Sequence, residues 1–370
     1  MFYLLTCTYY DTEIYKTEKL CIYIEGNILT RGAIMKKIVL MILMLFLSVI
    51  IVGCSGTANN DSNRDLKVAL VLTGAINDKG WNQKGYEGLV VIAAEYKAQT
   101  AYNENTQPGQ YNQIIRTYAK DGYEVIIAHG TQFTDAVIEV AAEYPDTKFL
   151  ISSSDRSAQI GNNKNIAGVL ADGVEQGFLQ GVAAGYIAVE QGSKKVGAIG
   201  GTEIPAIKTT VDGFAAGVKY VDSSIQVLQA YTGSFDDVNK LKEQAIAFIQ
   251  QGATVVMSTA NAATKGGFEA TKDKNGISIG ANSDSLFGTY SFNLAASANV
   301  DMSKALLLVV GEIVDDKFQG KNYIYGIKEG VVAISYSTTE PLIQKVKAKI
   351  DQVVAEIIND KLDVKDYYGK

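Results

Sequence analysis

The sequence has one histidine, three cysteines and four prolines in 370 residues, and these low counts limit the chemistry it can perform. A single histidine excludes sites that need two, and three cysteines cannot form a disulfide framework or a zinc site with four cysteine ligands. Charged residues make up 20% of the chain and the net charge is −6, so no surface for nucleic acid is expected. The hydrophobic fraction of 47% is ordinary for a folded globular protein, which argues against intrinsic disorder and a multispan membrane protein.

Motifs of common enzyme classes are also missing. The sequence has no Gly-x-Ser-x-Gly nucleophile elbow, no Walker loop, no His-Glu-x-x-His zinc motif and no Cys-x-x-Cys pair. The glycines at 197, 200 and 201 follow an expected strand, but their spacing differs from that of a dinucleotide-binding fingerprint. We therefore expect a protein that is not an enzyme and that uses no cofactor and no metal.

The segment before residue 66 differs from the rest of the chain. Lys36 and Lys37 precede sixteen uncharged, mostly apolar residues, 38–53, which are typical of a secretory signal peptide and short for a membrane span. This stretch ends in Ile-Val-Gly followed by Cys54, the pattern of a bacterial lipoprotein cleavage site. The alternative is an ordinary buried cysteine after an apolar helix. We expect Cys54 to carry a lipid and to anchor the chain on the extracytoplasmic face of the cell membrane, with residues 54–65 as a polar tether.

Residues 1–34 precede this signal and show no clear period. A start codon assigned upstream of the true initiator, Met35, is the simplest explanation, and a genuine cytoplasmic extension is the alternative. Cys7 and Cys21 lie in the segments that processing would remove. Cys54 would then be the one cysteine of the mature chain, so no disulfide is expected.

From residue 66 onward, short β-branched runs alternate with helical segments, a pattern typical of parallel sheets with crossover helices. The pattern occurs twice. The strand that follows Gly122 corresponds to the strand that follows Gly252, 130 residues later, and Asp155 corresponds to Asp284 at an offset of 129 residues. The sequence therefore predicts an α/β fold with two doubly wound parallel-sheet lobes.

Crossover segments are expected to join the two lobes. The expected N-terminal lobe comprises residues 66–171 and 297–322, and the C-terminal lobe comprises residues 172–296 and 323–370. Additional strands are expected at 290–294 and 331–336, on either side of a helix at 303–318. Between the two halves, glycines recur every fourth residue from Gly173 to Gly185, which predicts a helix packed closely on a sheet.

Ligands of doubly wound folds bind outside the carboxyl ends of the strands, so the loops there carry the candidate binding residues. Trp81 lies at a helix start beside Asn77, Asp78 and Asn82, and an indole ring can stack on a planar ligand. The alternatives are that Trp81 packs over the helix start and that Asn77 or Asp78 caps the helix.

Further candidates follow other strands. Phe235 precedes two acids at a helix start, where it could close an aromatic sandwich with Trp81, although a core position fits it nearly as well. Asp155 and Asp284 could accept hydrogen bonds from hydroxyl or ring N–H groups, or could be solvated loop acids. The full set expected to contact ligand is Asn77, Asp78, Trp81, Asn82, His129, Phe133, Asp155, Gly201, Phe235, Asn261, Asn282 and Asp284.

Several short motifs occur in the order found in a known family. They are Asn77–Asn82 (Asn-Asp-Lys-Gly-Trp-Asn), Tyr144–Phe149, Gly181–Gly185, Val196–Gly201, Gly213–Lys219 and Gly233–Asp237. In these motifs, residues 66–340 resemble the BMP (basic membrane protein) group of lipoproteins, which includes purine nucleoside receptors of ABC importers and the Med regulators. The resemblance implies a type I periplasmic-binding-protein fold with a hinged cleft.

In nucleoside-binding members of this family, the base lies between two aromatic side chains at the positions of Trp81 and Phe235. This sequence departs from the family elsewhere. Ser152-Ser153 replace the acid that ends one strand, Asn282 replaces the first of two acids in another motif, which keeps Asp284, and a lysine is missing before Val300. The resemblance therefore implies a purine nucleoside as the leading ligand, with a free base or another planar or sugar-like solute as alternatives.

The resemblance also implies a role. We expect a monomeric, lipid-anchored receptor that captures a small molecule and delivers it to the permease and ATPase subunits of an ABC importer. A signalling lipoprotein read by a membrane regulator is the alternative from another class, and a surface enzyme such as a nucleoside hydrolase is a third.

Overall fold

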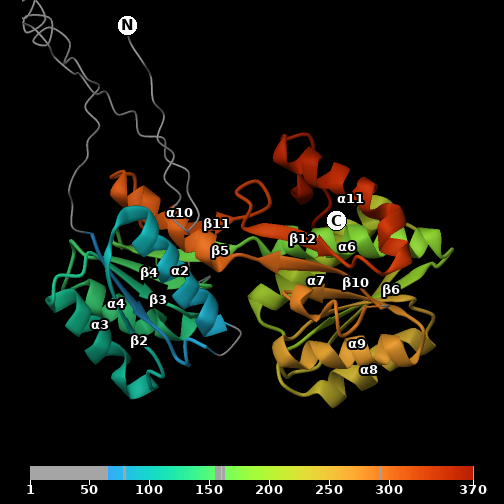
Figure 1. Cartoon of the computed structure of the whole chain (residues 1–370), viewed down its shortest axis with the longest axis horizontal. Helices are drawn as coiled ribbons and strands as arrows, with labels where there is room; N and C mark the ends of the chain where they lie inside the picture. Colours follow the sequence, from blue (N-terminus) through green and yellow to red (C-terminus); the bar gives the residue numbers. More distant parts are fainter. Residues whose placement is uncertain (1–65, 78–80, 155–159, 161–162, 292, 370) are drawn as a thin grey trace, which may run out of the picture. The chain divides into compact units, whose positions relative to one another are not determined.

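The computed structural model describes residues 66–77, 81–154, 160, 163–291 and 293–369, which form two α/β lobes (Figure 1). The expected leader, signal peptide and tether, with Cys54, lie outside the described residues, as do Asp78 and Asp155. Among the described helices, none is both long enough and apolar enough to cross a membrane.

Lobe 1 is built on a parallel six-stranded sheet with the order β11-β5-β4-β3-β1-β2. Successive residues of its central strand face opposite sides. Val68 and Leu70 pack against helices of one face, and Ala69 and Val71 against helices of the other. This lobe contains β1 (Lys67–Val71), α2 (Trp81–Tyr96), β2 (Gln99–Asn103), α3 (Tyr111–Lys120), β3 (Val125–Ala128), α4 (Thr134–Ala141), β4 (Lys148–Ser152), β5 (Ile166–Ala171), α10 (Met302–Val314) and β11 (Asn322–Tyr325).

Lobe 2 repeats this plan with the order β12-β10-β9-β8-β6-β7. Its strands are parallel except for β12, which runs antiparallel to β10. The predicted duplication is therefore confirmed in the strand order, and the two sheets differ in the direction of the edge strand, β11 or β12. Lobe 2 contains α6 (Gly173–Glu190), β6 (Lys195–Gly200), α7 (Pro205–Val221), β7 (Gln226–Tyr231), α8 (Val238–Gln250), β8 (Val255–Thr259), α9 (Thr264–Asp273), β9 (Ile277–Ala281), β10 (Leu294–Val300), β12 (Val332–Tyr336) and α11 (Pro341–Ile358).

The glycine repeat of α6 brings two helices together. A side chain at Gly177 or Gly181 would collide with the α7 backbone, at the carbonyls of Thr210 and Phe214 respectively. Gly213 and Gly217 of α7 face α6 in the same way. The close packing is therefore between α6 and α7, not between a helix and a sheet as the sequence predicted.

The chain passes between the lobes three times, from β5 to α6, from β10 to α10 and from β11 to β12. Backbone hydrogen bonds join these segments: Asp172 N donates to Tyr325 O at 2.8 Å, and Asp301 N donates to Val331 O at 2.8 Å. The Glu175 carboxylate accepts from Ile327 N at 2.6 Å, and burial raises the pKa of this carboxyl. The three crossings therefore form one hydrogen-bonded hinge.

The last strands differ from the sequence prediction. The strand expected at 290–294 lies instead at Leu294–Val300, and Asn322–Tyr325 forms a strand where none was expected. β10 belongs to the second sheet and β11 to the first, so the sheets change over at 300–302 and 325–332, a few residues beyond the divisions expected at 296 and 322. β10 is rich in alanine, serine and asparagine, which carry little strand signal in a sequence.

Candidate functional site

The carboxyl ends of the central strands carry unusual backbone conformations. Ser153 follows β4 with φ of 58°, Asn261 follows β8 with φ of 43°, and Asn282 follows β9 with φ of 51°. Left-handed conformations are uncommon for residues other than glycine and cluster at functional sites. This strain lies at the edge of each sheet where the fold predicts ligand binding.

Trp81, at the start of α2, lies flat on His129, which follows β3. The ring centroids are 4.1 Å apart with 18° between the ring planes. Trp81 Nε1 donates to the His129 carbonyl at 3.3 Å, and His129 Nε2 lies 2.9 Å from the Trp81 carbonyl. Trp81 is 37% exposed and His129 is fully buried, so the indole rests on a buried ring and keeps part of its own surface exposed.

Polar side chains fix the loop after β1. Asn82 Oδ1 accepts a hydrogen bond from Gly74 N at 3.0 Å, and Glu104 Oε2 accepts from Ile76 N at 2.8 Å. Asn77 is exposed. The Asn82 carbonyl oxygen thus shapes the loop, and Glu104 is a supporting residue that the sequence did not single out, although it follows β2 directly.

Phe133 occupies a different environment from Trp81. Its side chain is fully buried in the core of lobe 1 and lies 4.3 Å from Tyr111, measured between ring centroids. In this conformation Phe133 is a core residue. The sequence could not separate this position from a ligand contact, because both place an aromatic side chain just after a strand.

In lobe 2, Phe235 packs over Gly201. A methyl group at Gly201 would lie 2.6 Å from Phe235 Cδ1, so only glycine leaves room for the ring. Backbone hydrogen bonds tie this loop to its neighbours, from Gly233 N to Gly201 O at 2.9 Å and from Ala263 N to Phe235 O at 2.9 Å. Phe235 is half-buried. The loops after β6, β7 and β8 are thereby held as one unit.

The remaining candidates of lobe 2, Asn261, Asn282 and Asp284, are all exposed. Asn282 Oδ1 accepts from Val300 N at 2.7 Å, which links the end of β9 to the end of β10. The amide group of Asn282 is thereby oriented by the hinge segment, while Asp284 begins a short 3₁₀ turn.

A network of neutral side chains surrounds Asn299, near the end of β10. Ser283 N donates to Ser297 Oγ at 2.8 Å, Ser297 Oγ donates to Asn299 Oδ1 at 2.8 Å, and Asn299 Nδ2 donates to Ser335 Oγ at 2.9 Å. The sequence did not reveal this network because its members belong to three separate segments. The alternation of Ser297 and Asn299 along β10 was the one available signal.

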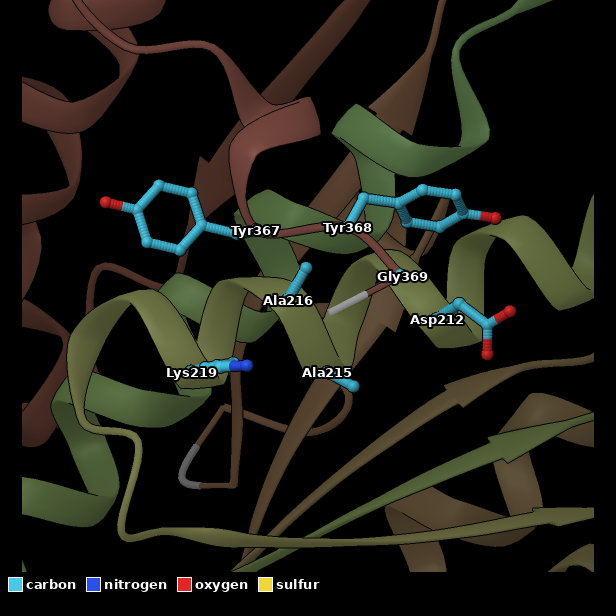
Figure 2. A pocket seen from close by; sticks show the side chains of 7 residues that line it. All are labelled: Asp212, Ala215, Ala216, Lys219, Tyr367, Tyr368 and Gly369. Atoms are coloured by element: carbon cyan, nitrogen blue, oxygen red, sulfur yellow. The ribbon is translucent and has the colours of Figure 1, made fainter.

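Two cavities lie away from the strand ends. One, of about 360 Å³, lies between the middle of α7 and the chain end, and Figure 2 shows Asp212, Lys219 and Tyr368 around it. The other, of about 480 Å³, lies near Gly276, which precedes β9. Neither is lined by a predicted binding residue. In the part of the chain that the structure describes, no group of three or more His, Cys, Asp or Glu side chains could hold a metal ion.

Known proteins match this chain across nearly all of the described residues. A family described as "ABC transporter substrate-binding protein PnrA-like" matches residues 65–367. Basic membrane protein A2 of Borrelia garinii subsp. bavariensis is 26% identical and covers 90% of this chain and 98% of its own length. The ABC transporter nucleoside-binding protein BmpA of Lactococcus lactis subsp. cremoris is 28% identical, and the match covers 89% of this chain and 99% of that protein.

A solved structure has the same fold. The ABC transporter solute-binding protein of Conexibacter woesei superposes with a TM-score of 0.64 at 22% identity, covering 82% of this chain and 99% of its own. This likeness confirms the type I periplasmic-binding-protein fold. The matching family consists of solute-binding proteins and is not a family of enzymes. From residue 65 to residue 367, the chain therefore belongs to the PnrA-like family of ABC transporter substrate-binding proteins.

Proposed function

We propose that this solute-binding protein captures a purine nucleoside between its lobes, with the base stacked on Trp81. The observation that carries the proposal is the state of the indole ring: one face rests on a buried imidazole, and the side chain keeps 37% of its surface exposed. Stacking of a base on an aromatic ring contributes about 1–3 kcal/mol. Such a ring, held flat on its partner and partly exposed, suits a planar heterocycle.

Features of lobe 2 support a ligand with hydroxyl groups as well as a flat ring. Phe235 is held over Gly201 as the second aromatic group, and Asn261, Asn282 and Asp284 are exposed at the strand ends. Amide and carboxylate oxygens accept hydrogen bonds from sugar hydroxyls and ring N–H groups. A relative of similar length is named as nucleoside-binding, which favours the same ligand class here.

The charges favour a nucleoside over a nucleotide. Asp284 is an exposed carboxylate at a strand end, and the sequence places Asp78 and Asp155 in two further loops of this kind. Carboxylates would repel a phosphate group. The resemblance to the family implies a lysine where this chain has the neutral side chain of Asn299, so we expect selectivity among nucleosides to differ from that of such members.

The cellular role follows from the family and the N-terminal sequence. We propose that Cys54 carries the lipid, that the protein stands on the outer face of the cell membrane as a monomer, and that it hands its ligand to an ABC permease. Two lobes joined by a hinge can close around a ligand, because a ligand that contacts both lobes favours the closed state.

The proposal is tested by extracting small molecules from purified protein for mass spectrometry, and then by calorimetric titration with inosine and guanosine. We expect an intact purine nucleoside in the extract and saturable binding. Trp81→Ala should weaken binding by about 5- to 150-fold, the range for loss of one base–aromatic stack. Ile358→Ala, which trims a 44% exposed side chain of α11, is the matched control and should leave affinity unchanged.

Each result bears on a separate part of the proposal. Absence of any bound purine compound would refute the nucleoside assignment. Unchanged affinity in Trp81→Ala would refute the stacking role. Conversion of the nucleoside to base and sugar during incubation would contradict a receptor. Nucleoside uptake that persists after deletion of the gene would favour the regulatory role that the family also contains.

A further inference from the structure

His129 is the only histidine of the sequence and its side chain is fully buried, yet it lies at the edge of the sheet where ligand is expected. The sequence suggested that this imidazole contacts the ligand. The imidazole also contacts Trp81, which stacks on it, and Ser152 at the end of β4. These contacts indicate a further role.

The hydrogen bonds between His129 and Trp81 are reciprocal. The indole N–H of Trp81 donates to the backbone carbonyl of His129, and the imidazole of His129 contacts the backbone carbonyl of Trp81. A carbonyl oxygen only accepts, so His129 Nε2 carries the proton in this contact. In the neutral ring, Nδ1 then accepts from the Ser152 hydroxyl, at 2.8 Å.

A second residue of α2 also packs closely on the imidazole. A methyl group at Gly85 of α2 would lie 2.7 Å from His129 Cδ2, so the ring fits under the helix only because residue 85 is glycine. Ser152 is fully buried at the end of β4, next to β3 in the sheet. A continuous series of contacts thus runs from the sheet through Ser152 and His129 to the indole.

We propose that His129 is a positioning residue, which holds the Trp81 indole with its outer face toward a planar ligand. The proposal rests on the proposed function, because it assumes that the ligand stacks on Trp81. It also has a consequence for recognition. The indole N–H is engaged by the His129 carbonyl, so Trp81 offers the ligand a ring face and no hydrogen-bond donor. Trp81 therefore favours flat rings in general, and selection among bases falls to other side chains.

The orientation of Trp81 can be measured without ligand, because the chain contains one tryptophan. We would record the near-ultraviolet circular dichroism of the indole and its quenching by acrylamide in the wild type, His129→Leu, His129→Phe and Ser152→Ala. We expect His129→Leu to lose most of the indole band and to raise the quenching constant about twofold or more. His129→Phe keeps a ring for stacking and should retain part of the band, as should Ser152→Ala.

A matched control separates positioning from general destabilisation. Thr271→Val removes hydrogen bonds of a fully buried side chain in lobe 2, whose hydroxyl donates to the carbonyls of Gly267 and Phe268. This variant should lower thermal stability without changing the indole band or the quenching constant.

Inosine titrations then distinguish positioning from direct contact. We expect His129→Leu to weaken binding by about threefold or more in the wild-type background, and by no measurable amount in the Trp81→Ala background. An equal loss in both backgrounds would overturn the proposal, because it would show that the imidazole acts without Trp81.

The spectra test the positioning role of His129 independently of the proposed nucleoside binding. If the wild type binds no nucleoside, the proposed function fails. The ligand-free spectra then still decide whether His129 positions the indole. An indole band unchanged by His129→Leu, with the Thr271→Val control also unchanged, would overturn the positioning role. A lost band in His129→Leu alone would support it.

Discussion

Single polar side chains fasten backbone segments that lie far apart in the sequence. Asn165, which precedes β5, places Nδ2 3.0 Å from the carbonyls of Ala141 and Tyr144 and 3.2 Å from that of Thr147. Its side chain is 8% exposed. One amide group therefore satisfies the carbonyls where α4 ends and where the turn leads into β4.

We expect Asn165→Ala to lower the free energy of unfolding by about 1–3 kcal/mol, because it leaves buried carbonyls without a donor. Urea unfolding followed by circular dichroism measures this change. Asn359→Ala removes an exposed amide that donates to Ala355 O at the end of α11, and it should cost clearly less. Equal losses in the two variants would contradict the reasoning.

The sequence indicated some of these residues and not others. Trp81 was found because it is a lone tryptophan at a helix start among amides, which are local features. Its partnership with His129 was not found, because the two residues are 48 positions apart and their contact depends on how α2 lies over β3. Local patterns identify candidate residues, whereas the tertiary fold decides which of them touch.

Among the elements, α6 and α7 pack more closely than side chains normally allow. Both helices carry glycines four residues apart, Gly177 and Gly181 on α6 and Gly213 and Gly217 on α7, and each would collide with the opposite backbone if it carried a Cβ. The spacing of four residues was visible in the sequence. The partner was not, because a glycine stripe fits a sheet as well as a helix.

We expect Gly181→Ala to destabilise the protein by about 3 kcal/mol, because the added methyl group meets the α7 backbone and neither helix can move without disturbing the core of lobe 2. Thermal unfolding compared with Gly109→Ala provides the measurement and the control, since nothing lies within 4 Å of a methyl group at Gly109. A Gly181→Ala protein as stable as Gly109→Ala would show that the helices can separate at little cost.

Element prediction failed where hydrophobicity was low. The strands after Gly122 and Gly252, the strand at 331–336 and the helix at 303–318 were expected close to their observed positions. β10 and β11 were misplaced or missed, because β10 is mostly alanine, serine and asparagine and β11 is four residues long. Their pairing with β9 and β5 gives them strand structure that local propensity does not.

At the scale of the whole molecule, a carboxylate lies within the hinge. Glu175, in the first turn of α6, accepts from Ile327 N in the third crossing segment, and its burial raises the pKa of the carboxyl. A group with a raised pKa in the folded state stabilises the fold fully below its unfolded pKa, and this contribution is lost as the pH rises through the folded pKa. The ionised hinge is therefore the less stable form.

We expect Glu175→Gln to raise the melting temperature at pH 8 and to change it little at pH 4, since the amide oxygen still accepts from Ile327 N without a charge. Melting curves at both pH values test this. Glu95→Gln, which removes an exposed carboxylate of α2, is the control for a change in net charge. A Glu175→Gln protein that is less stable than the wild type at pH 8 would contradict the expectation.

The three crossings also set the order in which the molecule can be completed. Lobe 1 receives α10 and its sixth strand only from residues 302–325, and lobe 2 receives β12 and α11 from residues 332–358. During synthesis from the N-terminus, the first lobe therefore lacks its sixth strand, β11, and helix α10 until almost nine-tenths of the chain has been made. Both lobes then finish within the last few dozen residues, so neither can be produced as a simple fragment by cutting the gene in two.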